Sequence, residues 1–422
     1  MFFITTIAMF KYTISKADKE LFGDVTLSPS IKTSSKVLVF RVLKKLGTEQ
    51  KFTPDKEETD LIFGNIPNKR KSLEKGDPGK ALRHLRSFFN FFKGEWIIAT
   101  SKISKEKPIE LIVNILQKEG INISFIERPS STPFKLTGKG FKGNTILRVD
   151  SSISSQVIKT SLLLSPTLPY SIIAEMKDRI LNSPYIELTL KALQLLGIHS
   201  EWKREEVLIE SEFKDGSELA IEADWCSASY LYELAALSKK CDITIKGLNI
   251  DSIQNDSIVK ELFVQLGVKT SVTSSGIRIV KEKNTTKLFD YDFTNNLNLV
   301  PTIAVTCVIL KIPFKLRGVE GLHTMYGDRI KSLQSELLKL GAKISLEKVN
   351  DQETLYFNGK VDKSIGKKIN ISTFEDHRMV MAFAPIAITG IQVTIENPKL
   401  TSISYTSYWE DLKKLRFVID QN

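Results

Sequence analysis

Residues 333–346 read LQSELLKLGAKISL and contain a pattern that recurs along the whole chain. Apolar residues at helical spacing in LQSELLKL predict a helix with one buried face. Gly341 follows the last turn, where glycine takes the left-handed conformation at little cost. The apolar residues of Ala342–Leu346 then predict a strand. The segment therefore predicts a helix, a glycine cap and a strand in direct succession.

The same helix pattern occurs six times. The copies are Val39–Gly47 (VFRVLKKLG), Ile112–Gly120 (IVNILQKEG), Leu188–Gly197 (LTLKALQLLG), Val259–Gly267 (VKELFVQLG), Leu333–Gly341 (LQSELLKLG) and Trp409–Leu415 (WEDLKKL). The five glycines are 73, 77, 70 and 74 residues apart, and Arg416 follows the sixth copy where the others have glycine. Such regularity predicts repeated supersecondary units that share cores. Six units in 422 residues divide most simply into two lobes of three, with a small-molecule site between the lobes.

Composition supports a globular protein of two domains. The chain has 422 residues, 42% hydrophobic and 26% charged, and its net charge is +11. The basic residues are mostly lysines spread along the chain, without an arginine-rich block or interleaved aromatics. A lysine-rich surface explains this best, and a basic cleft for small anions is the next explanation. A nucleic-acid binder is the least favoured.

The cysteines and the N-terminal residues indicate a cytoplasmic protein. Cys226, Cys241 and Cys307 are far apart and form no metal-binding or disulfide spacing. The apolar run Met1–Phe10 is too short to span a membrane, which takes about 20 residues. Its first charge, Lys11, follows the run, whereas a secretory signal has the charge in front. We interpret the run as a first strand or an extended start, rather than as a targeting signal.

Seven further segments carry chemical groups in a distinctive order. They are DSSISSQVIKTSLLLSP (150–166), NSPYIELTL (182–190), DWCSASY (224–230), TIAVTC (302–307), GDRI (327–330), EDHRM (375–379) and SYTSYWEDL (404–412). Each segment alone is a weak signal. Their order and spacing together resemble the EPSP synthase (3-phosphoshikimate 1-carboxyvinyltransferase) family of enolpyruvyl transferases, over roughly residues 23–420.

The resemblance implies a fold and a reaction. The fold is α/β (α+β), with two lobes of three βαβαββ units each, described as an inverse α/β barrel or prism. One lobe would be residues 1–27 plus 229–422, the other 28–228, with the active-site cleft between them. The family reaction transfers enolpyruvate from phosphoenolpyruvate to the 5-hydroxyl of shikimate 3-phosphate, in aromatic amino acid biosynthesis. It needs no metal or organic cofactor, and we expect a monomer that binds these small phosphorylated substrates and neither nucleic acid nor membrane.

Several substrate-binding residues of the family are retained. The resemblance places Ser154, Ser155 and Gln156 at the sugar phosphate and enolpyruvate, although the same serines could cap a helix. It places Tyr185 on the shikimate side and Gly79 in the enolpyruvate loop.

The resemblance makes Arg329 and Arg378 the two arginines that hold phosphoenolpyruvate. Guanidinium groups bind carboxylate and phosphate through two parallel hydrogen bonds, which lysine cannot do.

Two N-terminal cation positions depend on the alignment register. The family signature Ser-Lys-Ser-x-x-Asn-Arg falls on Ser30–Lys36 (SIKTSSK), where Lys36 replaces the arginine without a gap and Lys32 replaces the lysine with one deletion. A one-residue slip turns strand side chains to the opposite face, so the two registers differ physically. The alignment register is also undecided in the stretch Ser101–Lys107, where the family has an arginine.

The proton-transferring positions of the family are altered. Asn298 stands at the position of the family base, and an amide does not accept a proton at physiological pH. Tyr326 stands at the position of the glutamate that handles the enolpyruvate proton, Met325 replaces a cation, and Ile403 replaces a lysine.

A missing general acid or base typically lowers the rate by about 10²–10⁴. Two hypotheses remain open: a slower transferase, or an inactive or repurposed relative that binds a phosphorylated ligand. Four carboxylates could replace the base only if the cleft were rearranged: Asp292, Glu320, Asp328 and Glu375.

A third interpretation is the sister family that transfers enolpyruvate to a UDP-sugar through a loop cysteine. Ser101–Ile109, where that loop is expected, contains none of the three cysteines. The segment EDHRM also favours the shikimate branch, so this interpretation is disfavoured.

Overall fold

The computed structural model describes residues 10–30, 222–349, 352–362 and 366–421, together with short segments between residues 94 and 209. The chain divides into two compact units, residues 1–31 with 222–422, and residues 32–221. The sequence-based division, which places the crossings near residues 28 and 228, stays a prediction.

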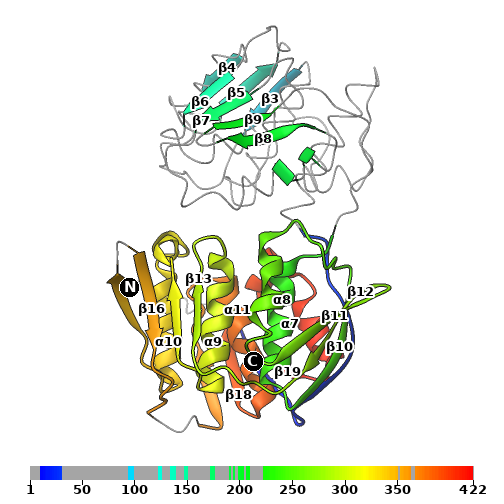
Figure 1. Ribbon diagram of the computed structural model, residues 1–422, viewed down its shortest axis with the longest axis vertical. Helices are drawn as coiled ribbons and strands as arrows, with labels where there is room; N and C mark the ends of the chain where they lie inside the picture. The colour runs from blue at the N-terminus through cyan, green and yellow to red at the C-terminus, as the bar shows by residue number, and fades with distance from the viewer. Residues whose placement is uncertain are drawn as a thin grey trace, which may run out of the picture. The chain divides into compact units, whose positions relative to one another are not determined.

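The first unit contains three sheets of four strands (Figure 1). The first has the order β2 (Glu20–Thr26), β10 (Lys240–Lys246), β12 (Gly276–Lys281) and β11 (Val268–Thr273). The second has the order β13 (Phe289–Asp292), β14 (Phe314–Arg317), β16 (Gln352–Phe357) and β15 (Ser345–Val349). The third has the order β17 (Lys368–Ile371), β18 (Gln392–Glu396), β1 (Lys11–Ser15) and β19 (Val418–Gln421).

All three sheets have one topology. The first two strands of each order are parallel, and the remaining pairs are antiparallel. A parallel pair needs a crossover connection, and a helix supplies it here. Each sheet is therefore a βαβαββ unit, as predicted. In the third sheet β1 lies between β18 and β19, so the N-terminal and C-terminal strands lie side by side.

Two kinds of helix connect these strands. The inner helices are α7 (Trp225–Leu237), α9 (Val300–Leu310) and α11 (His377–Phe383). The outer helices are α8 (Val259–Leu262), α10 (Arg329–Lys339) and α12 (Tyr408–Lys414). Short 3-10 helices are η2 (Asn255–Ile258), η3 (Leu297–Leu299), η4 (Glu320–Thr324), η5 (Ala384–Thr389) and η6 (Pro398–Ile403).

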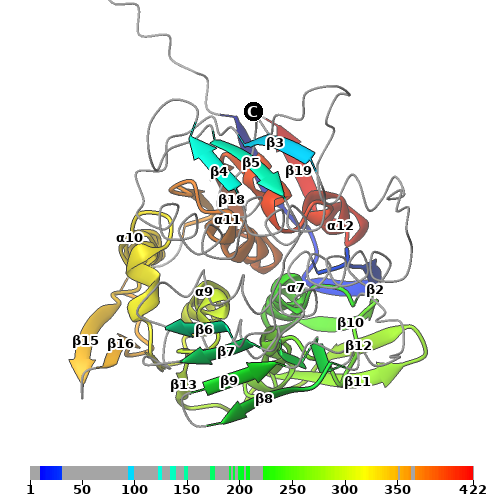
Figure 2. The same cartoon turned by 90° about the horizontal axis from the view of Figure 1, so that it is seen from above.

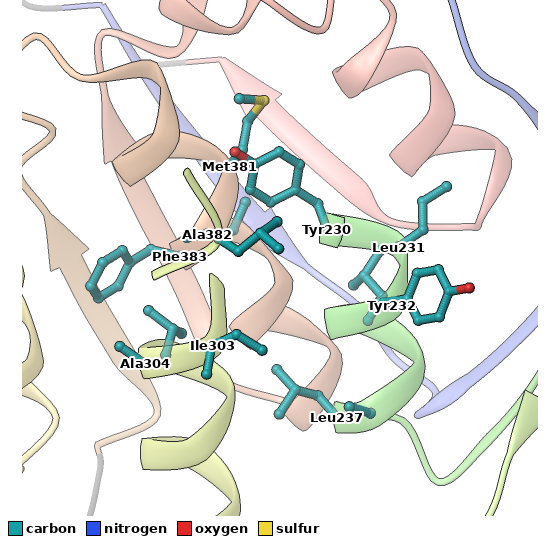
Figure 3. Close-up of a cluster of buried hydrophobic side chains, with 14 of the residues drawn as sticks. Tyr230, Leu231, Tyr232, Leu237, Ile303, Ala304, Met381, Ala382 and Phe383 are labelled. Atoms are coloured by element: carbon teal, nitrogen blue, oxygen red, sulfur yellow. The ribbon is translucent and has the colours of Figure 1, made fainter. Parts of the chain in front are cut away.

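The inner helices form the centre of the first unit. Every residue of α7 and α11 is buried, as are the first nine residues of α9. A helix that is apolar all round must be enclosed by other elements, and Figure 2 shows the three sheets arranged around these helices. Figure 3 shows their side chains meeting, with Tyr230 of α7 beside Met381 of α11. The sequence TIAVTC (302–307) is thus a buried core helix.

The inner helices α7, α9 and α11 begin at the same end of the unit. Near their first residues, Arg378 of α11 donates to Cys226 of α7, and the hydroxyls of Ser229 (α7) and Thr302 (α9) are 3.5 Å apart. The N-terminal ends of these helices therefore lie close together.

Of the five glycines predicted to follow the repeat helices, Gly267 and Gly341 are described, and both take the left-handed conformation. Gly267 and Gly341 have φ of +79° and +80°. Arg416 also takes the left-handed conformation, with φ of +65°, although it is not glycine. The sixth copy therefore keeps the cap geometry without the residue that favours it.

Two predicted boundaries were wrong. The helix predicted at Val259–Gly267 ends at Leu262 as α8. The backbone N–H groups of Leu266 and Gly267 donate to the carbonyls three residues earlier, not four as in an α-helix. The strand predicted at Ala342–Leu346 begins at Ser345, because Ala342 bridges to Val361. Of the predicted first strand Met1–Phe10 only Phe10 is described, and β1 begins at Lys11.

The second unit has two described sheets. One has the order β3 (Gly94–Ile98), β5 (Phe134–Gly138) and β4 (Asn122–Phe125). The other has the order β6 (Leu147–Asp150), β7 (Ile172–Glu175), β9 (Glu206–Ile209) and β8 (Ser200–Lys203). The second of these repeats the pattern of a parallel pair followed by two antiparallel pairs. The helices predicted at Val39–Gly47 and Ile112–Gly120 lie outside the described residues.

All three cysteines are described, buried and free of disulfides. Within the ranges that the structure describes, no helix combines the length and apolar character needed to cross a membrane.

Candidate anion-binding site

Arg329 and Arg378 are linked through one carboxylate. Arg329 is the first residue of α10, and its Nε donates to Oδ2 of Asp376 at 2.5 Å. The other oxygen of Asp376 accepts the backbone N–H of Arg378 at 2.9 Å and caps α11. Both Arg329 and Asp376 have side chains that are 1% exposed. The structure therefore brings together the two arginines that the sequence predicted as ligands.

The guanidinium of Arg378 is buried and makes no described hydrogen bond to a carboxylate. Its residue is 7% exposed, and its Nη1 donates to Sγ of Cys226 at 2.7 Å and to Oη of Tyr230 at 3.4 Å. Among residues 222–349, 352–362 and 366–421, no carboxylate forms a direct ion pair with it, although the Asp256 carboxylate of η2 attracts its charge and acts to raise its pKa. A buried guanidinium is costly unless it is paired with an anion. This arginine is therefore suited to an anionic ligand.

Tyr230 stays protonated beside Arg378. Burial raises the pKa of its phenol, and this outweighs the opposing effect of the nearby Arg378 guanidinium. The phenol is therefore a neutral partner that does not compete with a ligand anion for the charge of Arg378.

Helix ends add to the positive potential of the site. Cys226 is the second residue of α7, and Arg329 is the first of α10. The N-terminus of a helix carries about half a positive charge. Negative ligands are therefore favoured where these helices begin.

The chain segments before both arginines contain left-handed non-glycine residues. Tyr326 has φ of +51°, and Phe374 and Glu375 have φ of +51° and +57°. Such backbone costs about 1–3 kcal/mol per residue and persists where the surroundings enforce it, frequently at functional sites. Both arginines thus follow constrained turns.

Tyr326 lies against the site. Its ring meets the His377 ring edge-on at 5.4 Å between centroids, and Cζ of Arg329 is 5.3 Å from the Tyr326 centroid. The side chain is 41% exposed. The residue at the family acid position therefore contacts a predicted ligand arginine and remains open to solvent.

The other altered positions have distinct surroundings. Met325 accepts a hydrogen bond on Sδ from Nη1 of Arg329 at 3.2 Å. The family cation at this position would instead repel the Arg329 guanidinium. Asn298 lies in η3, half-buried, directly before α9. Ile403 ends η6 and is 40% exposed.

All four candidate replacement bases hold structural hydrogen bonds. Asp292 accepts from the backbone N–H of Thr294 at 2.9 Å, and Glu375 accepts from Asn397 at 2.7 Å. Glu320 accepts the backbone N–H of Glu353, and Asp328 caps α10. These carboxylates stabilise turns and caps, which disfavours them as free bases.

One buried hydroxyl near the site has no described hydrogen-bond partner. Thr373 is 1% exposed, its Oγ1 is unsatisfied, and its carbonyl accepts the N–H of Asp376 at 2.9 Å. Buried polar groups normally have partners, so this hydroxyl is available to a ligand or a water molecule. In the described part of the chain, no group of His, Cys, Asp and Glu side chains is placed to hold a metal ion.

The remaining predicted ligands lie outside the described residues. These are Lys32, Lys36, Gly79, Ser154, Ser155, Gln156 and Tyr185, together with both register alternatives. Their roles stay predictions. Sequence reasoning missed the contact of Cys226 with Arg378, although the segment DWCSASY was recognised. Nothing in the local pattern of that segment indicates which residue it contacts 152 positions away.

Comparison with known proteins gives the family. The model of the family described as EPSP synthase (3-phosphoshikimate 1-carboxyvinyltransferase) matches residues 31–412. A 3-phosphoshikimate 1-carboxyvinyltransferase of Bacteroides fragilis is 30% identical over 410 residues, covering 97% of this chain and 98% of the relative. A 3-phosphoshikimate 1-carboxyvinyltransferase of Photobacterium profundum is 28% identical, and the match covers 89% of this chain and 87% of the relative.

Solved structures agree in fold. An EPSP synthase from Acinetobacter baumannii has a TM-score of 0.72 at 16% identity, covering 98% of this chain and 100% of that one. The enolpyruvyl transferase NikO from Streptomyces tendae has a TM-score of 0.62 at 14% identity, covering 98% and 99%. These likenesses confirm the predicted fold class. Since the family model spans most of the sequence and a relative reaches 30% identity along nearly all of it, the chain belongs to the EPSP synthase family.

Proposed function

We propose that this protein binds phosphoenolpyruvate through Arg329 and Arg378 and transfers its enolpyruvyl group to the 5-hydroxyl of shikimate 3-phosphate, more slowly than relatives with the family acid and base. The observation that carries the proposal is the buried Arg378, which forms no direct ion pair with a carboxylate in the described part of the chain and is linked through Asp376 to Arg329. Two fixed guanidinium groups match the carboxylate and phosphate of phosphoenolpyruvate. The proposed protein is a cytoplasmic monomer that needs no cofactor.

The reaction requires three proton transfers. The C3 carbon of phosphoenolpyruvate gains a proton, and the 5-hydroxyl oxygen bonds to C2 and loses its proton, which gives a tetrahedral adduct. Inorganic phosphate then leaves as C3 gives up a proton, which restores the carbon–carbon double bond of the enolpyruvyl group. Positioned cations stabilise the charge on phosphate as it departs. Arg329 and Arg378 perform this task in the proposal.

Tyr326 is the proposed proton donor. Its phenol lies at the family acid position, and Cζ of Arg329 is 5.3 Å from the centroid of its ring. Asn298 cannot accept the hydroxyl proton. The lack of a base at this position predicts a rate lower by about 10²–10⁴.

A second candidate is a protein that binds the phosphorylated ligand without turnover. It is favoured by Asn298 and by the structural hydrogen bonds of all four alternative carboxylates. In this case the two arginines and the proposed serine cradle of the second unit, Ser154–Gln156, would serve binding alone.

Calorimetric titration and phosphate release distinguish these candidates. The protein is titrated with phosphoenolpyruvate, alone and with shikimate 3-phosphate, and phosphate release is followed. Arg378→Gln should abolish phosphoenolpyruvate binding. Arg317→Gln is the matched control, because Arg317 is 45% exposed and pairs with Asp290 away from Asp376.

Slow turnover supports the transferase, and binding without turnover supports the second candidate. A wild-type protein that binds neither ligand, or an Arg378→Gln variant that binds like wild type, would overturn the proposal.

A further inference from the structure

His323 of η4 bridges two carboxylates. Its Nδ1 lies 3.1 Å from Oδ2 of Asp328, and its Nε2 lies 2.8 Å from Oε2 of Glu353. Asp328 precedes α10, and Glu353 belongs to β16. The imidazole ring therefore connects the turn before Arg329 to the second sheet.

Only a charged ring satisfies both contacts. An ionised carboxylate accepts hydrogen bonds and donates none, and a neutral imidazole has one N–H and one lone pair. In either neutral tautomer, one lone pair of the ring would face a carboxylate oxygen. The geometry therefore requires the imidazolium form, in which both ring nitrogens donate.

The pKa shifts agree in direction. The hydrogen bond to Asp328 raises the pKa of His323 above 6.5, against the opposing effect of burial and with help from Glu353. Burial acts to raise the pKa of Asp328, but the hydrogen bond from His323 and the backbone N–H of Lys331 outweigh it and lower it.

Asp328 orients the start of α10. Its Oδ1 accepts the N–H of Lys331 at 3.2 Å, and its carbonyl accepts from the N–H and Oγ of Ser332 at 3.2 and 3.1 Å. Arg329 is the next residue, and its Nε must reach Asp376. A displacement of Asp328 would therefore move Arg329 directly.

We propose that His323 is a positioning residue, which as an imidazolium fastens the Asp328 cap to Glu353 and thereby holds Arg329 in its binding orientation. Its loss of a proton replaces one attractive contact by a repulsive one and loosens the turn 325–328. The effect on ligand binding rests on the proposed function, whereas the clamp itself does not.

The other charged groups at the clamp are few in the described part of the chain. Nζ of Lys331 is 3.4 Å from Oδ2 of Asp328, on the exposed side. Glu320, on the same 3-10 helix as His323, accepts the backbone N–H of Glu353. Lysine and glutamate keep their charges between about pH 6 and 9, so His323 is the group at this clamp that titrates there.

The direction of the pH effect follows from the raised pKa of His323. The clamp is fully formed below the ordinary histidine pKa of 6.5. It is lost as pH rises through the raised pKa of the folded protein.

The first test measures the ring itself. Proton–carbon NMR of histidine-labelled protein follows each imidazole with pH, and His323→Gln identifies the signal of His323 by its loss. We expect a pKa above 6.5, lowered in Glu353→Gln. A pKa at or below 6.5, or one unchanged in Glu353→Gln, would overturn the clamp.

The second test measures binding with phosphoenolpyruvate as the probe. Wild-type affinity should fall by about fivefold or more, the lower end of usual coupling between sites, as pH rises through the measured pKa of His323. His323→Gln should bind phosphoenolpyruvate weakly at low pH and should not show this pH-dependent fall in affinity. Titration of phosphoenolpyruvate itself affects both proteins equally. The control is His199→Gln, an exposed histidine of the second unit, which should keep the wild-type profile.

The outcomes separate the two proposals. If wild type binds no phosphoenolpyruvate at any pH, the proposed function fails, and the NMR pKa still decides the clamp. If wild type binds the ligand and His323→Gln retains the same pH step, the positioning role is wrong.

Discussion

Nε of Arg329 lies 2.5 Å from Oδ2 of Asp376, and both side chains are 1% exposed. The two residues are 47 positions apart and belong to different repeat units. Asp376 also caps α11 through its other oxygen. One carboxylate thus sets the position of both predicted ligand arginines, and its removal should affect stability and binding together.

Asp376→Asn should destabilise the protein strongly. The amide keeps an oxygen for the cap but leaves the Arg329 guanidinium buried without a counter-ion, which costs about 3–5 kcal/mol. Urea unfolding measures the free energy. Asp290→Asn is the control, because its exposed pair with Arg317 at 2.9 Å contributes about 1 kcal/mol or less. Equal losses in both variants would contradict the role of Asp376.

Asn298→Asp should raise turnover. The new carboxylate supplies a base at the family position, and a positioned base contributes about 10²–10⁴ in rate. Phosphate release with phosphoenolpyruvate and shikimate 3-phosphate measures the gain. Asn295→Asp adds the same charge at an exposed position three residues earlier and should change nothing. Identical rates in the two variants would remove Asn298 from the explanation of slow turnover.

Glu233→Gln should stabilise the protein increasingly as pH rises. Glu233 is fully buried in α7, its two oxygens have no described hydrogen-bond partner, and burial raises its pKa well above 4.5. The wild-type protein therefore loses stability as pH rises above 4.5, because only the unfolded chain releases the proton.

The gain in Glu233→Gln should grow by about 1.4 kcal/mol per pH unit between the ordinary and the raised pKa. Urea unfolding at several pH values tests this. The exposed Glu410→Gln serves as control and should show no pH-dependent gain. A pH-independent change in Glu233→Gln would mean that Glu233 is ionised in the folded protein.

Arg416→Gly should stabilise the cap after α12. Arg416 has φ of +65°, where a side chain costs about 1–2 kcal/mol and glycine costs little. We expect the free energy of unfolding, measured by thermal or urea unfolding, to rise by about 1 kcal/mol. Lys413→Gly, inside α12, should instead lower the free energy of unfolding by about 1 kcal/mol. A loss in both variants would show that the Arg416 side chain makes a stabilising contact that outweighs the strain.

The sequence alone determined the fold class and the repeat. Helical periodicity, a cap glycine and an apolar strand are local features within about ten residues, so each repeat could be recognised without its partners. The same locality explains the errors in boundaries, since Ala342 leaves its predicted strand to pair with Val361. The family motifs named Arg329 and Arg378 because each arginine lies inside a short distinctive segment.

Tertiary structure alone decided the contacts of these residues. Arg329 meets Asp376 across 47 residues, His323 meets Glu353 across 30, and Arg378 meets Cys226 across 152. Strand β1 likewise completes a sheet formed by residues 368–421. No local pattern encodes such pairs, because they form only when segments far apart in the sequence pack together. The charge state required of His323 follows from this packing, since it depends on both carboxylates being in place.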